Sequence, residues 1–436
     1  MIPSHLAPNL LLAPNLLNVN AKQDVAIHYV LDFNRHREHL VNVVMSFDMT
    51  EMIHPDEGFG LWLPTWIAGS YLVREFSKNI TKVIAYDEMG RAYRAYKSAK
   101  NHYEFTGIHQ TGRITVHYEV YCHDLSVRTA FVDDSRLFGN FTSLLFMLSG
   151  NEWASACVHL HVPQDFLVKN EGSSLACGLP HIVREHEWGE EYLLAPKQAF
   201  AYYDYPFEFG VQSLFDFTVQ ASGRSIGHRF FIAGRHRTDL TRLSADVQKI
   251  CQSYAHLLGD VPFADYTFMT MVTVGDYGGL EHINSTALIT ARTDLPVNES
   301  HVPSESYQRF LGLCSHEYFH AWWVKSVCPD VMISCDLQAE TYTSLLWVFE
   351  GFTSYLDDLM LLVSGVIDRA SYFKLITAQI NRYYKTDGRI HQSVAESSFD
   401  TWIKLYRPDE NTTNQSVSYY NKGALVALCL DLSLLK

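Results

Sequence analysis

The sequence predicts an α+β fold, in which a β-rich N-terminal domain precedes a mainly helical domain with a small sheet. The first observation is that apolar and polar residues alternate with a period of two in many segments up to about residue 235. The second is that apolar residues recur at helical spacing over most of the chain after about residue 304. Strands that come first and helices that come later indicate an α+β layout.

The first half is predicted to contain strands because of this alternation. The segments with the pattern are residues 24–33, 39–49, 113–125, 156–163, 216–223 and 228–234. The DEMG sequence at 87–90 has the residue types of a turn between strands. We therefore assign residues 1–235 to the N-terminal β-rich domain; in one alternative this range includes a linker from about residue 165.

Residues 236–436 are assigned to a second domain. Strands are expected at 266–275 and 286–292, and helices at 238–260, 304–326, 338–364 and 369–386. Gly259 and Gly365 follow two of these helices, and Asp368 is a candidate N-cap of the last. The final stretch, GALVALCLDLSLLK, has a helical pattern without a stop signal. We therefore expect a domain that is truncated at its C-terminal end.

The composition excludes several classes of function. The 436-residue chain has a formal net charge of -14, from 34 basic and 48 acidic residues, so a nucleic-acid partner is not expected. No stretch of about 18 apolar residues occurs, so membrane insertion is not expected either. The N-terminal segment has no basic residue before Lys22 and is interrupted by prolines, which argues against a signal peptide. Eight scattered cysteines without a C-x-x-C pair favour free thiols and a cytoplasmic location.

The sequence HEYFHAWW at 316–323 predicts a metal site. Histidines four residues apart lie on one face of a helix, so His316 and His320 can direct two imidazoles at one ion, and Glu317 can reach a water on that ion. The expected cofactor is one zinc ion, although cobalt or manganese also suits such ligands. The alternative is a helix whose two histidines are merely packed in the core.

The next predicted helix carries a candidate for the third metal ligand. Glu350 is a lone acid among Trp347, Val348, Phe349 and Phe352. A carboxylate buried in such surroundings is costly unless it is paired or bound to a metal. Glu340 is the rival candidate, but it lies in a more polar stretch that suits a surface position.

Together, HEYFHAWW and the WVFEGFTSYLDDLML sequence at 347–361 resemble the glycyl aminopeptidase family of gluzincin zinc metallopeptidases. The resemblance implies a thermolysin-like catalytic domain in which the third zinc ligand is a glutamate, here Glu350. It also implies that Glu317 is the catalytic base. Family members usually continue into a C-terminal PDZ domain, which we expect to be missing from a chain that stops at Lys436.

A second segment, VGDYGGLEHINST at 274–286, resembles the substrate-binding segment of related aminopeptidases. The resemblance implies that Glu281 binds the free α-amine of the substrate, and an ammonium group in a partly dry pocket does need a carboxylate partner. Gly278 and Gly279 would let the backbone approach a ligand closely. His282 stands where other aminopeptidases have asparagine. The alternative is an ordinary Gly-Gly turn.

The SVSYYNKGALVAL sequence at 416–428 resembles the family segment that carries a catalytic tyrosine. By this match Tyr420 donates a hydrogen bond to the oxyanion of the tetrahedral intermediate, a type of interaction worth about 3–4 kcal/mol. Tyr419 adjoins it, so the register stays open by one residue.

Two N-terminal segments, residues 63–80 and 128–144, also resemble family segments, with Ala68 in place of a usual proline. Trp66, Tyr71 and Arg74 of the first segment are candidates to border the cleft. Turn formation and core packing are the alternative explanation for these residues.

The function that these motifs indicate is a zinc-dependent aminopeptidase, which removes an N-terminal glycine or alanine through a metal-activated water. Its partners are then peptides with a free N-terminus, and the sequence does not indicate an oligomeric state. Two alternatives stay open: a zinc endopeptidase or other zinc hydrolase, and an inactive, truncated peptide-binding protein.

Overall fold

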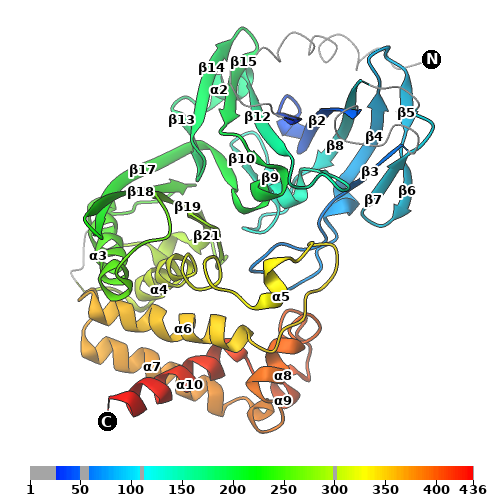
Figure 1. Ribbon diagram of the computed structural model, residues 1–436. Coiled ribbons are helices and arrows are strands. Elements are labelled where there is room, and N and C mark those ends of the chain that lie inside the picture. Colours follow the sequence, from blue (N-terminus) through cyan, green and yellow to red (C-terminus); the bar gives the residue numbers. More distant parts are fainter. Residues whose placement is uncertain (1–25, 50–57, 109–111, 298–301, 436) are drawn as a thin grey trace.

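A computed structural model describes residues 26–49, 58–108, 112–297 and 302–435. Strands of the N-terminal half fill the upper part of the molecule, and C-terminal helices fill the lower part (Figure 1). The predicted α+β class is confirmed. The segment for which we expect no signal peptide lies outside the described residues. Among the described helices, none is long and apolar enough to cross a membrane.

The N-terminal half is built on one large sheet. Its strands follow the order β14 (His181–His186), β15 (Gly189–Leu194), β12 (Ser155–Pro163), β1 (Ile27–Asp32), β2 (Leu40–Asp48), β8 (Arg113–Tyr121), β4 (Ile80–Tyr86) and β5 (Ala92–Arg94), with β16 (Lys197–Gln198) beside β12. A smaller sheet contains β11 (Met147–Leu148), β3 (Phe59–Trp62), β7 (His102–Phe105) and β6 (Tyr96–Ala99). Period-two alternation places Ile27, Tyr29 and Leu31 of β1 in the core, as expected for strands with one buried face.

A third sheet joins the two halves of the chain. Its order is β20 (Gly278–Glu281), β21 (Ser285–Ala291), β19 (Asp265–Thr273), β18 (Arg224–Ala233), β17 (Phe207–Ala221), β10 (Arg136–Gly139) and β9 (Ala130–Val132), and β13 (Ser173–Cys177) also pairs with β17. Because β18 pairs with β19 in parallel, this sheet runs across residue 235. The domain boundary at that residue stays a prediction.

The long helices of the second half are α3 (Leu240–Leu258), α4 (Glu305–Phe319), α6 (Leu346–Val363), α7 (Arg369–Tyr384) and α10 (Tyr419–Leu434). Shorter helices of this half are α5 (Asp330–Ile333), α8 (Val394–Phe399) and α9 (Thr412–Gln415), while α2 (Gln164–Lys169) belongs to the N-terminal half. Side chains of Asp239, Ser304 and Asp368 cap α3, α4 and α7 by accepting backbone N–H bonds.

Two predicted helices are shorter than their patterns indicated. The helix expected at 304–326 ends at Phe319, because the next residues leave the helical path and Val324 has a φ of 124°. The indole of Trp322 donates to the carbonyl of Asp260, and that of Trp323 donates to the carbonyl of Val348. These two hydrogen bonds hold Trp322 and Trp323 against other elements, and the helix does not continue through them.

The helix expected at 338–364 begins only at Leu346. The preceding residues are held in an extended loop by the N-terminal half of the chain. The hydroxyl of Thr65 donates to the carbonyl of Gln338, and the indole of Trp66 donates to the carbonyl of Ala339. Carbonyls that accept these long-range bonds are not available for a helix, so tertiary contacts override the local helical pattern.

Helices α6 and α10 cross in close contact at two glycines. A Cβ atom added to Gly351 would lie 2.6 Å from the Cα of Gly423, and one added to Gly423 would lie 2.9 Å from the Cα of Gly351. Only residues without a side chain allow such an approach of two backbones. The crossing brings the first turn of α10 next to Glu350.

We predict that Gly351→Ala destabilises the protein by about 1–3 kcal/mol. The added methyl group would overlap the backbone of α10, which cannot rotate away as a side chain can, and this outweighs the better helix propensity of alanine. Chemical denaturation measures the effect. Gly275→Ala is the matched control, because no other described atom lies within 4 Å of its added Cβ. Equal stability of the two variants would contradict the tight crossing.

Candidate active site

Helix α4, which carries the HExxH sequence, is fixed by three buried hydrogen bonds. Tyr318 shares a bond of 3.0 Å with His228 Nε2 of β18, and Ser315 shares one of 3.0 Å with the Tyr254 hydroxyl of α3. The Tyr266 hydroxyl of β19 donates to the carbonyl of Glu317 at 3.3 Å. Burial lowers the pKa of His228 to about 4, so its ring is neutral and accepts a hydrogen bond from Tyr318. The helix is therefore anchored on the sheet and on α3.

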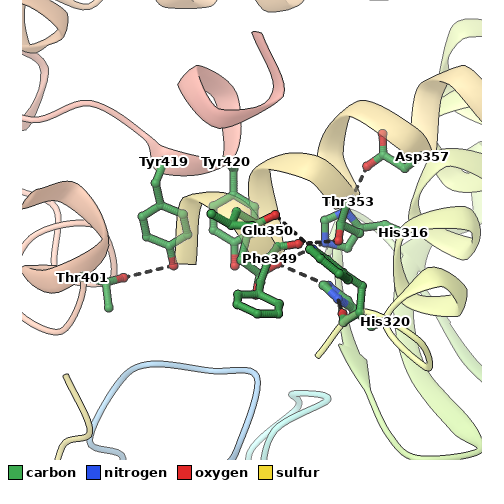
Figure 2. A network of polar contacts seen from close by, with 12 residues as sticks. His316, His320, Phe349, Glu350, Thr353, Asp357, Thr401, Tyr419 and Tyr420 are labelled. Atoms are coloured by element: carbon green, nitrogen blue, oxygen red, sulfur yellow. Dashed lines mark hydrogen bonds and ion pairs between the residues drawn. The ribbon is translucent and has the colours of Figure 1, made fainter. Parts of the chain in front are cut away.

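His316, His320 and Glu350 converge on one point between α4 and α6, as Figure 2 shows. Glu350 Oε2 lies 3.5 Å from His316 Nε2 and 3.2 Å from His320 Nε2. The side chains of His320 and Glu350 are each only 2% exposed. The rival Glu340 is exposed and lies in the loop before α6. The structure thus brings Glu350 to the two histidines.

The second nitrogen of each histidine has a partner that orients the ring. Asp357 Oδ2 accepts from His316 Nδ1 at 2.9 Å (Figure 2). The carbonyl of Trp323 accepts from His320 Nδ1 at 2.9 Å. A carbonyl can only accept, so Nδ1 of His320 carries a proton, and Nε2 is the nitrogen left for a metal. Both Nε2 atoms therefore face Glu350, which is the orientation that metal-binding histidines have.

This donor set fits zinc. Two imidazoles and one carboxylate are the ligands of many catalytic zinc ions, and bond lengths of about 2.0–2.2 Å place tetrahedral ligand atoms roughly 3.3–3.5 Å apart. The observed separations of 3.5 and 3.2 Å are close to this range. Burial alone would raise the pKa of Glu350, but the charges and hydrogen bonds of His320 and His316 outweigh it and lower that pKa to about 2. Glu350 is thus an anion, as a ligand must be.

Glu317 and Glu281 form a second buried group beside the first. One carboxylate oxygen of each and a ring nitrogen of His320 lie within 4.8 Å of one another. Glu281 is 3% exposed and Glu317 5%. Burial raises the pKa of Glu317 to about 7, against the opposing charges of His316 and His320. In the part of the chain that the structure describes, Oε1 of Glu281 and Oε2 of Glu317 have no hydrogen-bond partner. Two buried acceptors are thus open to a ligand.

Two glycines leave room for these carboxylates. A Cβ on Gly279 would lie 2.2 Å from Glu317 Oε1, and a Cβ on Gly69 would lie 2.3 Å from Glu281 Oε1. Gly69 belongs to the N-terminal segment 63–80 and has a φ of 86°, which favours glycine. At Gly278 a Cβ would meet no atom closer than 3.5 Å, so this position is not tight.

His282 is buried and bound to protein groups. Its Nδ1 lies 3.1 Å from Asp204 Oδ1, and Lys325 Nζ contacts the same carboxylate oxygen at 2.8 Å. Asp204 ends the 3₁₀ helix η5 (Ala199–Asp204) of the N-terminal half. His282 therefore ties the end of β20, next to Glu281, to that half of the chain.

The two candidate tyrosines have different surroundings. The hydroxyl of Tyr419 is buried and accepts from Thr401 Oγ1 at 3.1 Å (Figure 2). Tyr420 lies with its ring 6.2 Å from the ring of His316, and its hydroxyl is 3.2 Å from that of Tyr406. Tyr420 is therefore the one of the pair that faces the histidines.

Of the N-terminal candidates, Trp66 and Tyr71 are buried and Arg74 is half-buried. Trp66 is fully buried, packs edge-on against Trp402 at 5.0 Å and holds the loop before α6. Tyr71 is also buried, and burial, followed by the charges of Glu350 and Glu281, raises its pKa well above the ordinary value.

Arg74 is half-buried and donates to Ser70 Oγ at 2.6 Å. Burial and the nearby Arg128 lower the pKa of Arg74 to about 10. Core packing thus explains the position of Trp66. Arg74 lies near Arg128, which contacts Gly279 beside the site.

Several residues of the site were not indicated by the sequence. Arg128 Nη2 donates to the carbonyl of Gly279 at 3.1 Å and so supports β20. Asp357 orients His316, and its only signal was its position seven residues after Glu350, on the same helical face. Gly69 carries no pattern that predicts contact with Glu281. Arg128 was visible only as the first residue of the segment 128–144.

Comparisons with known proteins agree with this architecture. A family model described as M61 glycyl aminopeptidase matches residues 309–426, and a model of the peptidase M61 N-terminal domain matches residues 28–211. A crystal structure of an aminopeptidase N family protein from Idiomarina loihiensis is similar, with 40% identity and a TM-score of 0.85. The match covers 94% of this chain and 66% of that one.

A mutant M1 zinc metallopeptidase from Deinococcus radiodurans, bound to a Tyr-Ser-Ala substrate, shares the fold alone. Its identity is 13% and its TM-score 0.53, over 94% of this chain and 83% of that one. No curated protein matches the sequence.

The family models and the Idiomarina structure place this chain among the aminopeptidase families. Within that class, the chain belongs to the M61 glycyl aminopeptidase family. It spans 66% of the length of the similar Idiomarina protein.

We predict that Asp357→Ala weakens zinc binding by about 10–100-fold, because His316 loses the partner that fixes its ring and proton. Competition with a chromogenic zinc chelator measures the affinity. Asp358→Asn is the matched control: this neighbour contacts Gln379, and burial and then Asp357 raise its pKa to about 8. An unchanged affinity in Asp357→Ala would show that His316 does not need this orientation.

Proposed function

We propose that this chain is a zinc-dependent aminopeptidase that removes a small N-terminal residue, glycine or alanine, from peptides. The observation that carries the proposal is the buried carboxylate of Glu281, which has an open oxygen within the same space as Glu317 and His320. An anion in this position is suited to the ammonium group of a peptide N-terminus. The preference for glycine or alanine rests on family membership.

The proposed zinc ligands are His316, His320 and Glu350. Zinc held by these residues would supply a Lewis acid that makes a water acidic enough to lose its proton near neutral pH. Glu317 is the proposed general base. Its pKa of about 7 suits a group that takes a proton and later returns it to the leaving amine.

Tyr420 is the proposed donor to the oxyanion of the tetrahedral intermediate. Two observations support this role: the ring of Tyr420 lies close to that of His316, and in the hydrogen bond between Tyr420 and Tyr406 either hydroxyl can be the donor. Tyr419 is the weaker candidate, because its hydroxyl is hydrogen-bonded to Thr401.

Glu281 would hold the substrate amine, while Gly279 and Gly69 keep space for the two carboxylates. Gly278 and His282 are placed next to this site in β20 and at its end. Because an amine bound at Glu281 fixes the distance from the N-terminus to the scissile bond, the enzyme would cleave after the first residue.

We predict that Glu317→Gln lowers kcat for glycyl and alanyl chromogenic amides by about 10²–10⁴-fold, because the amide cannot accept the proton of the water. Zinc content and KM should change little, since Glu317 is not a proposed ligand. Glu340→Gln, on an exposed residue, is the control and should keep full activity. Zinc-loaded wild-type protein without turnover would overturn the enzyme assignment and favour a peptide-binding protein.

We predict that Glu281→Ala lowers kcat/KM for peptides with a free N-terminus by on the order of 10–100-fold, because a charge-assisted hydrogen bond is lost. Cleavage of matching N-acetylated peptides should not fall. Glu281→Gln keeps the shape of the side chain without its charge and should show the same selectivity change. If cleavage of both substrate types fell equally, the protein would be better described as an endopeptidase or another zinc hydrolase.

A further inference from the structure

A cluster of histidine, cysteine and glutamate side chains lies in the N-terminal sheet, on strands β1, β12 and β15. Cys157, His159 and His161 alternate along β12 and therefore share one face of the sheet. His28 of β1 is in register with Cys157, so it points to the same face. The opposite face of β12 packs in the hydrophobic core. In Figure 1, β12 and β15 lie in the upper part of the molecule, away from α4 and α6.

The side chains converge closely. Cys157 Sγ lies 3.0 Å from His28 Nδ1 and 3.3 Å from His159 Nε2, and the three ligand atoms all lie within 4.8 Å of one another. Cys157 and His159 are buried. Apolar side chains would fill this space at less cost than two imidazoles and a thiol, so the residue types themselves require an explanation.

The orientation of His159 is that of a metal ligand. Glu191 Oε1 of β15 lies 2.6 Å from His159 Nδ1, which leaves Nε2 directed at Cys157. The same arrangement holds His316 in the active site, where Asp357 contacts Nδ1 and Nε2 faces the other ligands. A carboxylate on the outer nitrogen is the usual partner of a metal-bound histidine.

We infer that His28, Cys157 and His159 form a second metal site, which binds a zinc-like divalent ion of borderline softness, with Glu191 as the positioning residue of His159. A thiolate and two imidazoles select such ions over magnesium or calcium, which prefer oxygen ligands. On binding, the thiol proton leaves to solvent and the sulfur bonds to the ion. His161, with 14% of its side chain exposed, contacts Glu191 at the solvent side of the cluster.

The site would be structural. It links β1 to β12, two parallel strands whose sequence positions are more than 120 residues apart. An ion between them crosslinks the folded sheet and contributes its binding free energy to stability. Loss of the site should therefore lower the melting temperature in the presence of zinc and leave kcat unchanged.

Cobalt titration of the metal-free full chain tests this inference. Cobalt(II) bound to a thiolate gives a near-ultraviolet charge-transfer band, and the ligand set of the active site contains no sulfur. We expect the band in the wild type and in a His316→Ala/His320→Ala double variant. It should be absent from Cys157→Ser and retained in Cys429→Ser, a control on an exposed cysteine.

Zinc analysis gives a second measurement: two ions per chain in the wild type, and one in either Cys157→Ser or the double variant. Circular dichroism of the metal-free forms checks folding. If Cys157→Ser does not fold, His159→Gln takes its place and should weaken cobalt binding at least 10-fold while Cys429→Ser does not. A wild type without the band, or a band that persists in Cys157→Ser, would overturn the inference.

Discussion

The packing of three carboxylates around two imidazoles is the constraint on which the rest of the structure depends. Glu281, Glu317 and Glu350 are all buried, and burial by itself would raise the pKa of Glu317 and of Glu350. Glu350 is nevertheless held as an anion by His316 and His320, whereas Glu317 stays poised near neutrality. Buried carboxylates are stable as anions only where positive charge compensates for their lost hydration. A divalent ion between the histidines and Glu350 would supply that positive charge.

The helices that meet this constraint are brought together by small residues. Gly351 lies next to Glu350 in α6, so the close crossing with Gly423 of α10 takes place one residue away from the proposed ligand. The first turn of α10 carries both Tyr419 and Tyr420. The orientation of the helix about its axis determines which of the two side chains faces the histidines. Because Tyr419 turns into the core towards Thr401, Tyr420 faces His316.

Local spacing predicted the centre of the site, while long-range packing determined the remainder. The i, i+4 spacing of His316 and His320 needs only a helix, and the apolar context of Glu350 needs only burial. The contact of Gly69 with Glu281 joins residues about 200 positions apart, so no local pattern predicts it. The end of α4 at Phe319 was missed for the same reason: the indole of Trp323 is bound to α6, which the sequence pattern does not reveal.

The proposed metal site and the proposed amine site depend on different parts of the chain. The proposed metal ligands come from α4, its C-cap residue His320 and α6. The proposed amine site is made where the two halves meet, with Gly69 against Glu281 and Arg128 on the carbonyl of Gly279. Strand β17 pairs with β10 and β13 of the N-terminal half and with β18, which in turn pairs with β19. This continuous sheet fixes the two halves relative to each other. The second half alone would keep the two histidines and Glu350 but lose the contact of Gly69 with Glu281 and that of Arg128 with Gly279, so the proposed amine site depends on both halves while the proposed metal site does not.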